Sequence, residues 1–245
     1  MKALLTSALG GYVKVNGERL PGAILQDNGL ADRLHAIWPP NARVLMICSD
    51  PAGHEKNDAY TACFRAAFPL NGLSLASIAV CDDRNPELIE RINETDVLFL
   101  MGGHVPTQNR FMRQLHLKER LHNYQGILIA CSAGSMNCAE TVYAAPEMEG
   151  EAVDPRYERW ISGLGLTHVN ILPHLQSVRD ELLDGQRLIE DIAFADSRRH
   201  EIIAIPDGSY LLIDGKREIL FGEAYRIRNG QMQRICENNE SVVLR

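Results

Sequence analysis

The sequence has no excess of positive charge and no long run of apolar residues. Its 245 residues include 25 Lys and Arg against 32 Asp and Glu, which gives a formal net charge of −7. A nucleic-acid-binding protein normally presents a basic face, so this balance argues against such a partner. No segment approaches the roughly 20 apolar residues of a membrane-spanning helix, and the apolar run after Met1 is too short for a signal-peptide core. We therefore expect a cytoplasmic protein without nucleic-acid or membrane partners.

Cysteine pairs at metal-binding spacing are also absent. Several cysteines lie within apolar runs, where a thiol packs as a small hydrophobic group. None of the six forms a Cys-x-x-Cys pair with another: they are Cys48, Cys63, Cys81, Cys131, Cys138 and Cys236. The spacing predicts neither a zinc site nor a disulfide framework. We expect no metal and no cofactor.

Short apolar runs alternate with amphipathic stretches through the first 140 residues. That alternation predicts βαβ units around a mostly parallel sheet flanked by helices. A chain of this length with 45% hydrophobic residues suits a single α/β domain spanning 1–245. A helix is expected to start at Pro86, after Asn85. The other expected elements are strands at 3–7, 44–49, 75–81, 96–101 and 126–131 and helices at 58–68 and 111–121.

The second half of the chain differs from the first in composition and periodicity. The segment 140–158 is rich in acidic residues and lacks a helical period, which favours a surface loop. The stretch 177–196, also acidic, is expected to be a helix. From Glu201 onward, short apolar runs are separated by turn-forming pairs, which predict β-hairpins. These pairs are Asp207-Gly208, Asp214-Gly215 and Asn229-Gly230.

One predicted junction between a strand and a helix carries a nucleophile. The apolar run ILIA leads directly into Cys131 and Ser132. A sharp turn there needs small residues two before and two after the nucleophile, and Ala130 and Gly134 flank Ser132 in that way. Centring the turn on Cys131 would put the branched Ile129 at a tight position, so Ser132 is the better candidate. A serine that only caps the following helix is the alternative interpretation.

A serine hydroxyl needs a base to take its proton and an acid to orient that base. His174 ends the apolar run 169–173, and Asp207 ends a similar run that closes in a proline. Functional groups collect at such strand ends in open α/β sheets. Gln176 excludes an acid two positions after His174, so Asp207 is the candidate acid. Each residue alone also has a non-catalytic interpretation: His174 as a histidine without a catalytic role, and Asp207 as part of an Asp-Gly turn.

Other residues fit the needs of acyl transfer. The predicted strand 96–101 ends in two glycines, and the N–H groups of Gly103 and Ala133 are expected to form an oxyanion hole. Arg110 and Arg179 are candidates for binding a substrate carboxylate, because a guanidinium matches its geometry. The acidic segment 140–158 could receive a free amino terminus.

Four blocks, in this order, resemble the peptidase E family of serine peptidases (alpha-aspartyl dipeptidases), with the cyanophycinases as more distant relatives. The blocks are Gly102-Gly103, Cys131-Ser132-Ala133-Gly134, Pro173-His174 and Ile205-Pro206-Asp207-Gly208. The resemblance covers roughly residues 40 to 225. It implies a class I glutamine amidotransferase-like (flavodoxin-like) fold and a triad of Ser132, His174 and Asp207. The implied activity is cleavage of short peptides, dipeptides with N-terminal Asp among them, through an acyl-enzyme.

Three positions depart from the family pattern. His104 stands where the family usually has Asn or Asp, which argues against strict aspartyl specificity and makes His104 a candidate substrate contact. Ala130 replaces a glycine, and Asp207 replaces the usual Glu. Two alternatives stay open: an amidotransferase-like enzyme that uses Cys131, and a ligand-binding member of the fold without turnover. The oligomeric state is also open, a homodimer being one option.

Overall fold

The computed structural model describes all 245 residues and places an eight-stranded sheet at the centre of the protein. The strand order is β18-β15-β14-β1-β7-β6-β4-β5, and the five strands from β1 to β5 in this order are parallel. These five are β1 (Lys2–Thr6), β4 (Ala42–Ile47), β5 (Leu75–Cys81), β6 (Val97–Leu100) and β7 (Ile127–Cys131). Strands β4, β6 and β7 are mostly buried and apolar, as expected of parallel strands covered on both faces, whereas β5, at the edge of the sheet, is partly exposed. The predicted α/β fold with a mostly parallel sheet is confirmed.

Antiparallel strands extend this sheet on the β1 side and form a second, smaller sheet. Strands β14 (Tyr210–Asp214), β15 (Arg217–Phe221) and β18 (Ser241–Val243) continue the large sheet. The second sheet consists of β10 (Ile171–Leu172), β13 (Ile202–Ala204), β16 (Ala224–Arg228) and β17 (Gln231–Cys236). Two of the predicted hairpin turns are present, in the β14–β15 and β16–β17 connections. The third, Asp207-Gly208, instead links β13 in one sheet to β14 in the other.

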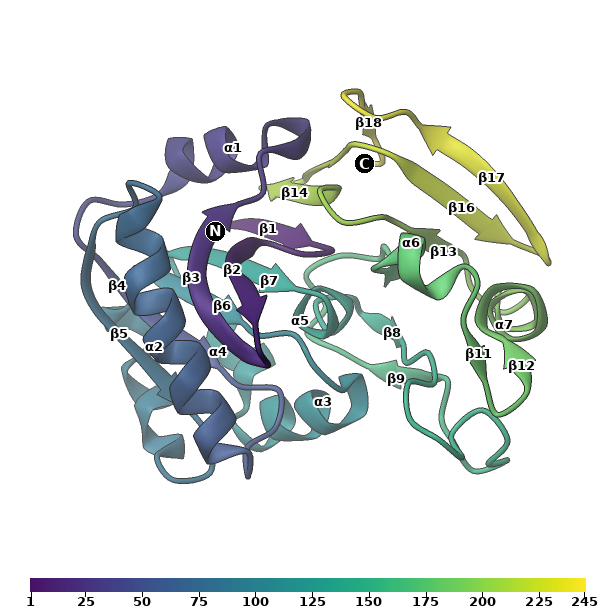
Figure 1. Cartoon of the computed structure of the whole chain (residues 1–245), viewed down its shortest axis with the longest axis horizontal. Helices are drawn as coiled ribbons and strands as arrows, with labels where there is room; N and C mark the ends of the chain where they lie inside the picture. The colour runs from purple at the N-terminus through teal and green to yellow at the C-terminus, as the bar shows by residue number, and fades with distance from the viewer.

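Helices cover the parallel strands. In Figure 1, α2 runs beside the hairpin of β2 and β3 over the large sheet. Aromatic packing joins helix to sheet, since the Phe64 ring on α2 lies 5.0 Å from the Phe99 ring on β6, centroid to centroid. The helices of this part are α1 (Leu30–Ile37), α2 (His54–Leu70), a 3₁₀-helix (Pro86–Glu94), α3 (Val105–Gln114) and α4 (Leu117–Leu121). No helix has both the length and the apolar character needed to cross a membrane.

Two helix predictions were wrong. The helix expected at 111–121 is divided into α3 and α4 by His116, whose φ of 50° is left-handed. The helix expected at 177–196 is interrupted because Asp184 and Gly185 both have positive φ and form a turn between two short strands. The elements there are α6 (Leu175–Val178), β11 (Leu182–Leu183), β12 (Gln186–Arg187), a π-helix (Leu188–Ala193) and α7 (Phe194–Asp196).

The acidic segment 140–158 is a loop for most of its length, but it begins in a strand. Strand β8 (Thr141–Tyr143) pairs with β9 (Trp160–Ser162) in antiparallel register. The residues between them, 144–159, form turns without helix or strand. In Figure 1 this loop lies next to the hairpin of β11 and β12, whose turn residue Asp184 accepts the N–H groups of Gly150 and Ala152.

The sequence interpretation missed a hairpin near the N-terminus, formed by β2 (Gly10–Val15) and β3 (Glu18–Ile24). Its turn is Asn16-Gly17, both at positive φ, and Asn-Gly between alternating apolar residues is a strong hairpin signal. The hairpin packs closely on α2, since a Cβ added at Gly11 would lie 2.8 Å from the Phe64 ring.

The junction of β7 with α5 (Ala133–Met136) has the predicted steric requirement. A Cβ on Gly134 would lie 2.5 Å from the Leu100 carbonyl oxygen and 2.8 Å from the Leu100 Cβ. Since the oxygen belongs to the backbone of a central strand, it cannot move aside cheaply. Gly134 therefore lets α5 start directly against β6.

Substituting Gly134 tests this close approach. We expect Gly134→Ala to lower the free energy of unfolding by about 3 kcal/mol, because the methyl group overpacks the junction. The control is Gly215→Ala in the β14–β15 turn, where no atom lies within 4 Å and only the left-handed φ is unfavourable, at about 1 kcal/mol. Urea denaturation measures both variants, and equal losses would contradict the steric argument.

Candidate active site

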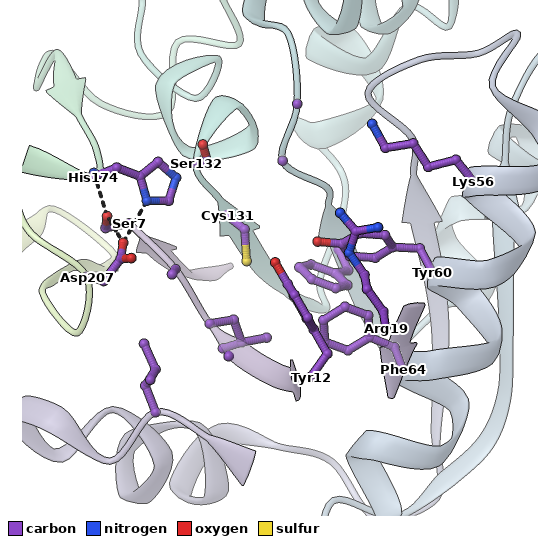
Figure 2. A pocket seen from close by; sticks show the side chains of 17 residues that line it. Ser7, Tyr12, Arg19, Lys56, Tyr60, Phe64, Cys131, Ser132, His174 and Asp207 are labelled. Atoms are coloured by element: carbon purple, nitrogen blue, oxygen red, sulfur yellow. Dashed lines mark hydrogen bonds and ion pairs between the residues drawn. The ribbon is translucent and has the colours of Figure 1, made fainter. Parts of the chain in front are cut away.

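The carboxyl ends of the parallel strands open into a cavity of about 430 Å³. Because parallel strands all end at one edge of the sheet, residues far apart in sequence meet there. Among the residues that line the cavity are Ser7, Gly102, Gly103, Cys131, Ser132, His174 and Asp207. The three residues of the predicted triad thus share one cavity (Figure 2).

Ser132 occupies a strained backbone conformation at the end of β7. Its φ of 49° and ψ of −117° lie outside the ordinary regions for a non-glycine residue, at a cost of about 1–3 kcal/mol. Its N–H donates to the carbonyls of Thr6 and Ser7 at 3.0 and 3.1 Å, and its carbonyl accepts the first hydrogen bond of α5 from Met136. These bonds hold the strained turn in place. Its side chain makes no capping hydrogen bond, so the helix-capping interpretation is wrong.

His174 and Asp207 form a hydrogen-bonded pair. Nδ1 of His174 lies 2.7 Å from Oδ1 of Asp207, and since an ionised carboxylate only accepts hydrogen bonds, the proton belongs on Nδ1. Ser7 reinforces the pair, because its hydroxyl donates to the same Asp207 oxygen at 2.6 Å and accepts the His174 backbone N–H at 2.8 Å. Figure 2 shows this triangle on one side of the cavity.

Asp207 is held in its ionised form. Burial raises the pKa of Asp207, but hydrogen bonds from His174 and Ser7 outweigh burial and hold the pKa below its ordinary value. Gln176, at the position where the sequence lacks an acid, accepts the Asp207 N–H at 3.0 Å. The side chain of Gln176 therefore helps to hold Asp207, the residue that supplies the carboxylate partner of His174.

Ser132 and His174 face the same cavity, but no hydrogen bond joins the Ser132 hydroxyl to the imidazole. Since Nδ1 is engaged by Asp207, Nε2 is the nitrogen available to the serine. Catalytic hydrogen bonds are often long in enzymes without substrate and shorten when substrate binds.

Of the two glycines after β6, Gly102 lies against Ser132 and Gly103 lies against Ser49. A Cβ on Gly102 would lie 3.2 Å from the Ser132 Cβ, and one on Gly103 would collide with the Ser49 hydroxyl. The N–H groups of Gly103 and Ala133 donate no hydrogen bond to the rest of the chain. Gly103 lines the larger cavity, whereas Ala133 is buried directly behind Ser132.

Cys131 lines the cavity beside Ser132, but its thiol is poorly suited to nucleophilic attack. Burial raises the pKa of the Cys131 thiol to about 12, and the thiolate is the reactive form. The Sγ atom also accepts a hydrogen bond from the Thr6 hydroxyl at 3.4 Å. That bond favours the thiolate, but burial outweighs it, and the raised pKa argues against the alternative in which Cys131 is the nucleophile.

A second cavity of about 170 Å³ adjoins the first at Ser132 and His174, which line both. Its wall is apolar, with Met136, Leu172 and Leu188, and it contains the carboxylates of Glu147 and Glu181. Glu147 stays accessible at the rim, yet desolvation and the nearby carboxylates of Glu151 and Glu181 raise its pKa to about 8.

His104 ties the acidic loop to the site instead of lining either cavity. Its Nε2 lies 2.9 Å from Oε1 of Glu151, and its Nδ1 lies 2.8 Å from the Thr107 hydroxyl. The other Glu151 oxygen accepts the backbone N–H groups of Glu147 and Met148. His104 thus positions the segment that carries Glu147.

The structure does not bring Arg110 or Arg179 to either cavity. Arg110 is exposed on α3, and Arg179 lies over the Tyr225 ring at 5.3 Å. The cations that line the larger cavity are Arg19 and Lys56, which the sequence interpretation did not select. The turn signal Asn16-Gly17 could have located the hairpin that carries Arg19. Ser7, at the end of the first predicted strand, was also missed.

One group of side chains has the composition of a metal site. Ligand atoms of His54, Asp82 and Asp83 lie within 4.8 Å of one another. The buried carboxylate of Asp82 is already bonded by Arg84 and Asn57, so a competing positive charge occupies its coordination space. None of the three lines the cavity of Ser132.

Comparisons with known proteins identify the family of this chain. The sequence profile of Peptidase family S51 matches residues 33–221, which include Ser132, His174 and Asp207. No curated protein matches the chain. Among solved structures, a protein of Listeria monocytogenes EGD-e, provisionally described as a peptidase E, aligns with a TM-score of 0.59 at 13% identity and shares the fold; the alignment covers 96% of this chain and 98% of that one. The chain therefore belongs to peptidase family S51, the peptidase E family of serine peptidases.

Proposed function

We propose that the protein cleaves short peptides, dipeptides with an N-terminal acidic residue among them, by means of a Ser132–His174–Asp207 triad. The observation that carries the proposal is the bonded pair of His174 and Asp207 in the same cavity as a strained serine. The Nδ1 atom of His174 is fixed by the carboxylate, which leaves Nε2 to act as base toward the Ser132 hydroxyl.

The reaction follows from this arrangement. The Ser132 Oγ attacks the scissile carbonyl carbon, and His174 takes the hydroxyl proton and then delivers it to the leaving amine nitrogen. The amine leaves, and an ester between Ser132 and the acyl part remains. Water then attacks this ester, with His174 again accepting a proton, and a carboxylic acid is released. The ionised Asp207 stabilises the imidazolium in both steps.

The N–H groups of Gly103 and Ala133 are proposed to stabilise the oxyanion. Their hydrogens have no partner within the chain, and Gly102 brings the end of β6 into van der Waals contact with Ser132. Donors that are already oriented toward developing charge lower the barrier without reorganisation.

The smaller cavity is proposed to receive the free amino terminus of the substrate. It is narrow, at about 170 Å³, and its polar groups near Ser132 are the carboxylates Glu147 and Glu181. A protonated amine would pair with them, which favours peptides whose scissile bond lies close to the amino terminus.

Removing the nucleophile tests the triad. We expect Ser132→Ala to lower kcat/KM for an Asp-Leu dipeptide by roughly 10⁵- to 10⁶-fold. Cys131→Ala is the matched control and should stay within about tenfold of the parent enzyme, because the thiol is protonated. An amine-reactive assay that monitors the release of leucine measures the activity of both variants. Loss of activity in Cys131→Ala with retention in Ser132→Ala would reverse the assignment.

Asp207→Asn tests the orienting role. We expect kcat to fall by roughly 10³- to 10⁴-fold, because the imidazolium loses its partner. Asp214→Asn, at an exposed ion pair with Lys2, should leave kcat unchanged. A loss of only a few-fold in Asp207→Asn would argue that another group orients His174.

The lowered pKa of Asp207 also predicts a pH dependence of stability. A carboxyl whose folded pKa is depressed stabilises the protein above its unfolded pKa, and that contribution is lost as pH falls through the folded value. The stability difference between wild type and Asp207→Asn should therefore be constant at neutral pH and shrink below about pH 4. Urea titrations between pH 3 and about 7 measure it.

Proton release on binding tests the amino-terminus site. With its pKa near 8, Glu147 is mostly protonated at neutral pH, and pairing with an ammonium group favours its ionised form. In the Ser132→Ala background, Asp-Leu should release up to one proton at about pH 7, measured by calorimetry in buffers of different ionisation enthalpy. Glu147→Gln should abolish the release, and Glu158→Gln, exposed on the same loop, should not. Equal release from all three proteins would refute the assignment.

A further inference from the structure

The hairpin of β2 and β3 places an unpaired guanidinium in the cavity of Ser132. Arg19 from β3 and Lys56 from α2 line this cavity opposite the His174–Asp207 pair (Figure 2). Neither cation belongs to any ion pair of the chain. The only carboxylate in the lining is Asp207, which His174 and Ser7 already engage. The cavity therefore has positive charge without a partner.

Aromatic rings fix the orientation of Arg19. The guanidinium carbon lies 4.6 Å from the centroid of the Tyr60 ring and 5.3 Å from that of Tyr12. Stacking of this kind suits the planar guanidinium and leaves its edge free to donate hydrogen bonds. The Nε atom of Arg19 is buried and has no hydrogen-bond partner. Because that atom is covered, the terminal nitrogens of the guanidinium are the donors left for a ligand in the cavity.

The hairpin is anchored, so Arg19 is held in place before a ligand binds. Asn71, at the end of α2, accepts the Ile24 N–H and donates to the Gly22 carbonyl, both at 2.9 Å. Gly11 lets the other strand lie directly on Phe64. The hairpin, residues 10–24, lies outside the range 33–221 that the family profile matches. Arg19 and Tyr12 are thus contributions of this chain beyond the matched family segment.

We infer that Arg19, assisted by Lys56, binds a carboxylate of the peptide substrate and so determines which peptides are cleaved. The inference rests on the proposed function and adds the ligand chemistry of the larger cavity. The two cavities that meet at Ser132 differ in their ionisable groups, with the cations Arg19 and Lys56 in one and the carboxyl groups of Glu147 and Glu181 in the other. A short zwitterionic peptide matches this polarity, its amine toward the glutamates and its carboxylate toward the hairpin. The carboxylate is either the C-terminal group or an acidic side chain.

Binding to the inactive Ser132→Ala protein separates these two sources. Asp-Leu, Asn-Leu and Asp-Leu amide are titrated by calorimetry, since Asn-Leu lacks the side-chain carboxylate and the amide lacks the C-terminal one. We expect one of the two analogues to bind roughly 10- to 100-fold more weakly than Asp-Leu, the effect of losing a charge-assisted hydrogen-bond pair. The weakened analogue identifies the carboxylate that Arg19 binds.

The same titrations are repeated with a double variant that carries Arg19→Gln together with Ser132→Ala. Affinity for Asp-Leu should fall by the same roughly 10- to 100-fold factor, while the weakened analogue should lose little more. Arg19→Lys should recover only part of the affinity, because an ammonium cannot form the bidentate contact. Lys216→Gln, exposed in the β14–β15 turn, makes the same charge change and should have no effect.

Two results would overturn the inference: unchanged Asp-Leu affinity in Arg19→Gln, or no binding of any of the three peptides. An equal loss of affinity for all three peptides in Arg19→Gln would also count against it, because the effect would then not depend on a carboxylate. The proposed function fails on a separate measurement, retention of peptide hydrolysis in Ser132→Ala.

Discussion

The carboxyl end of β1 is the point on which the site depends. The carbonyls of Thr6 and Ser7 accept the N–H of the strained Ser132, and the Thr6 carbonyl also accepts the Ser135 hydroxyl. The Ser7 hydroxyl joins the His174 backbone to the Asp207 carboxylate. Ser132, His174 and Asp207, the residues of the proposed triad, are therefore all bonded to the same two residues. Thr6 and Ser7, at the end of the central strand β1, therefore fix the positions of these three residues relative to one another.

In the proposed mechanism, catalysis and substrate selection are carried out by different parts of the chain. The strained serine, the glycines after β6 and the His174–Asp207 pair occupy loops at the ends of strands, where backbone N–H groups and side chains can face a ligand. The charged groups that surround them come from outside the large sheet: Arg19 from the hairpin and Glu147 from the loop tied down by Glu151 and His104. Changes in these two segments would alter the preferred peptide and leave the chemistry in place.

Much of this could be predicted from the sequence, for identifiable reasons. Parallel strands are short continuous apolar runs, and even β5, at the partly exposed edge of the sheet, was predicted at its observed residues. The elbow was predictable because its small residues are adjacent in sequence. The helix at 177–196 was not, since the local turn at Asp184-Gly185 overrides the periodic pattern. The role of Ser7 could not be predicted either, because its partners lie 167 and 200 residues away and meet only in the folded sheet.

The position of β1 in the sheet determines at what stage of folding the site can form. This strand pairs on one side with β7 and on the other with β14, in registers that run to Ile127–Cys131 and Tyr210–Asp214. Such pairings between distant segments form slowly, because the entropy cost of closing a long loop comes before any favourable contact is made. Strand β1 therefore cannot complete its pairing until β14 has been synthesised, and the Ser7 hydroxyl finds its partner only after Asp207 has emerged. A nascent chain that ends before Asp207 would have no peptidase activity.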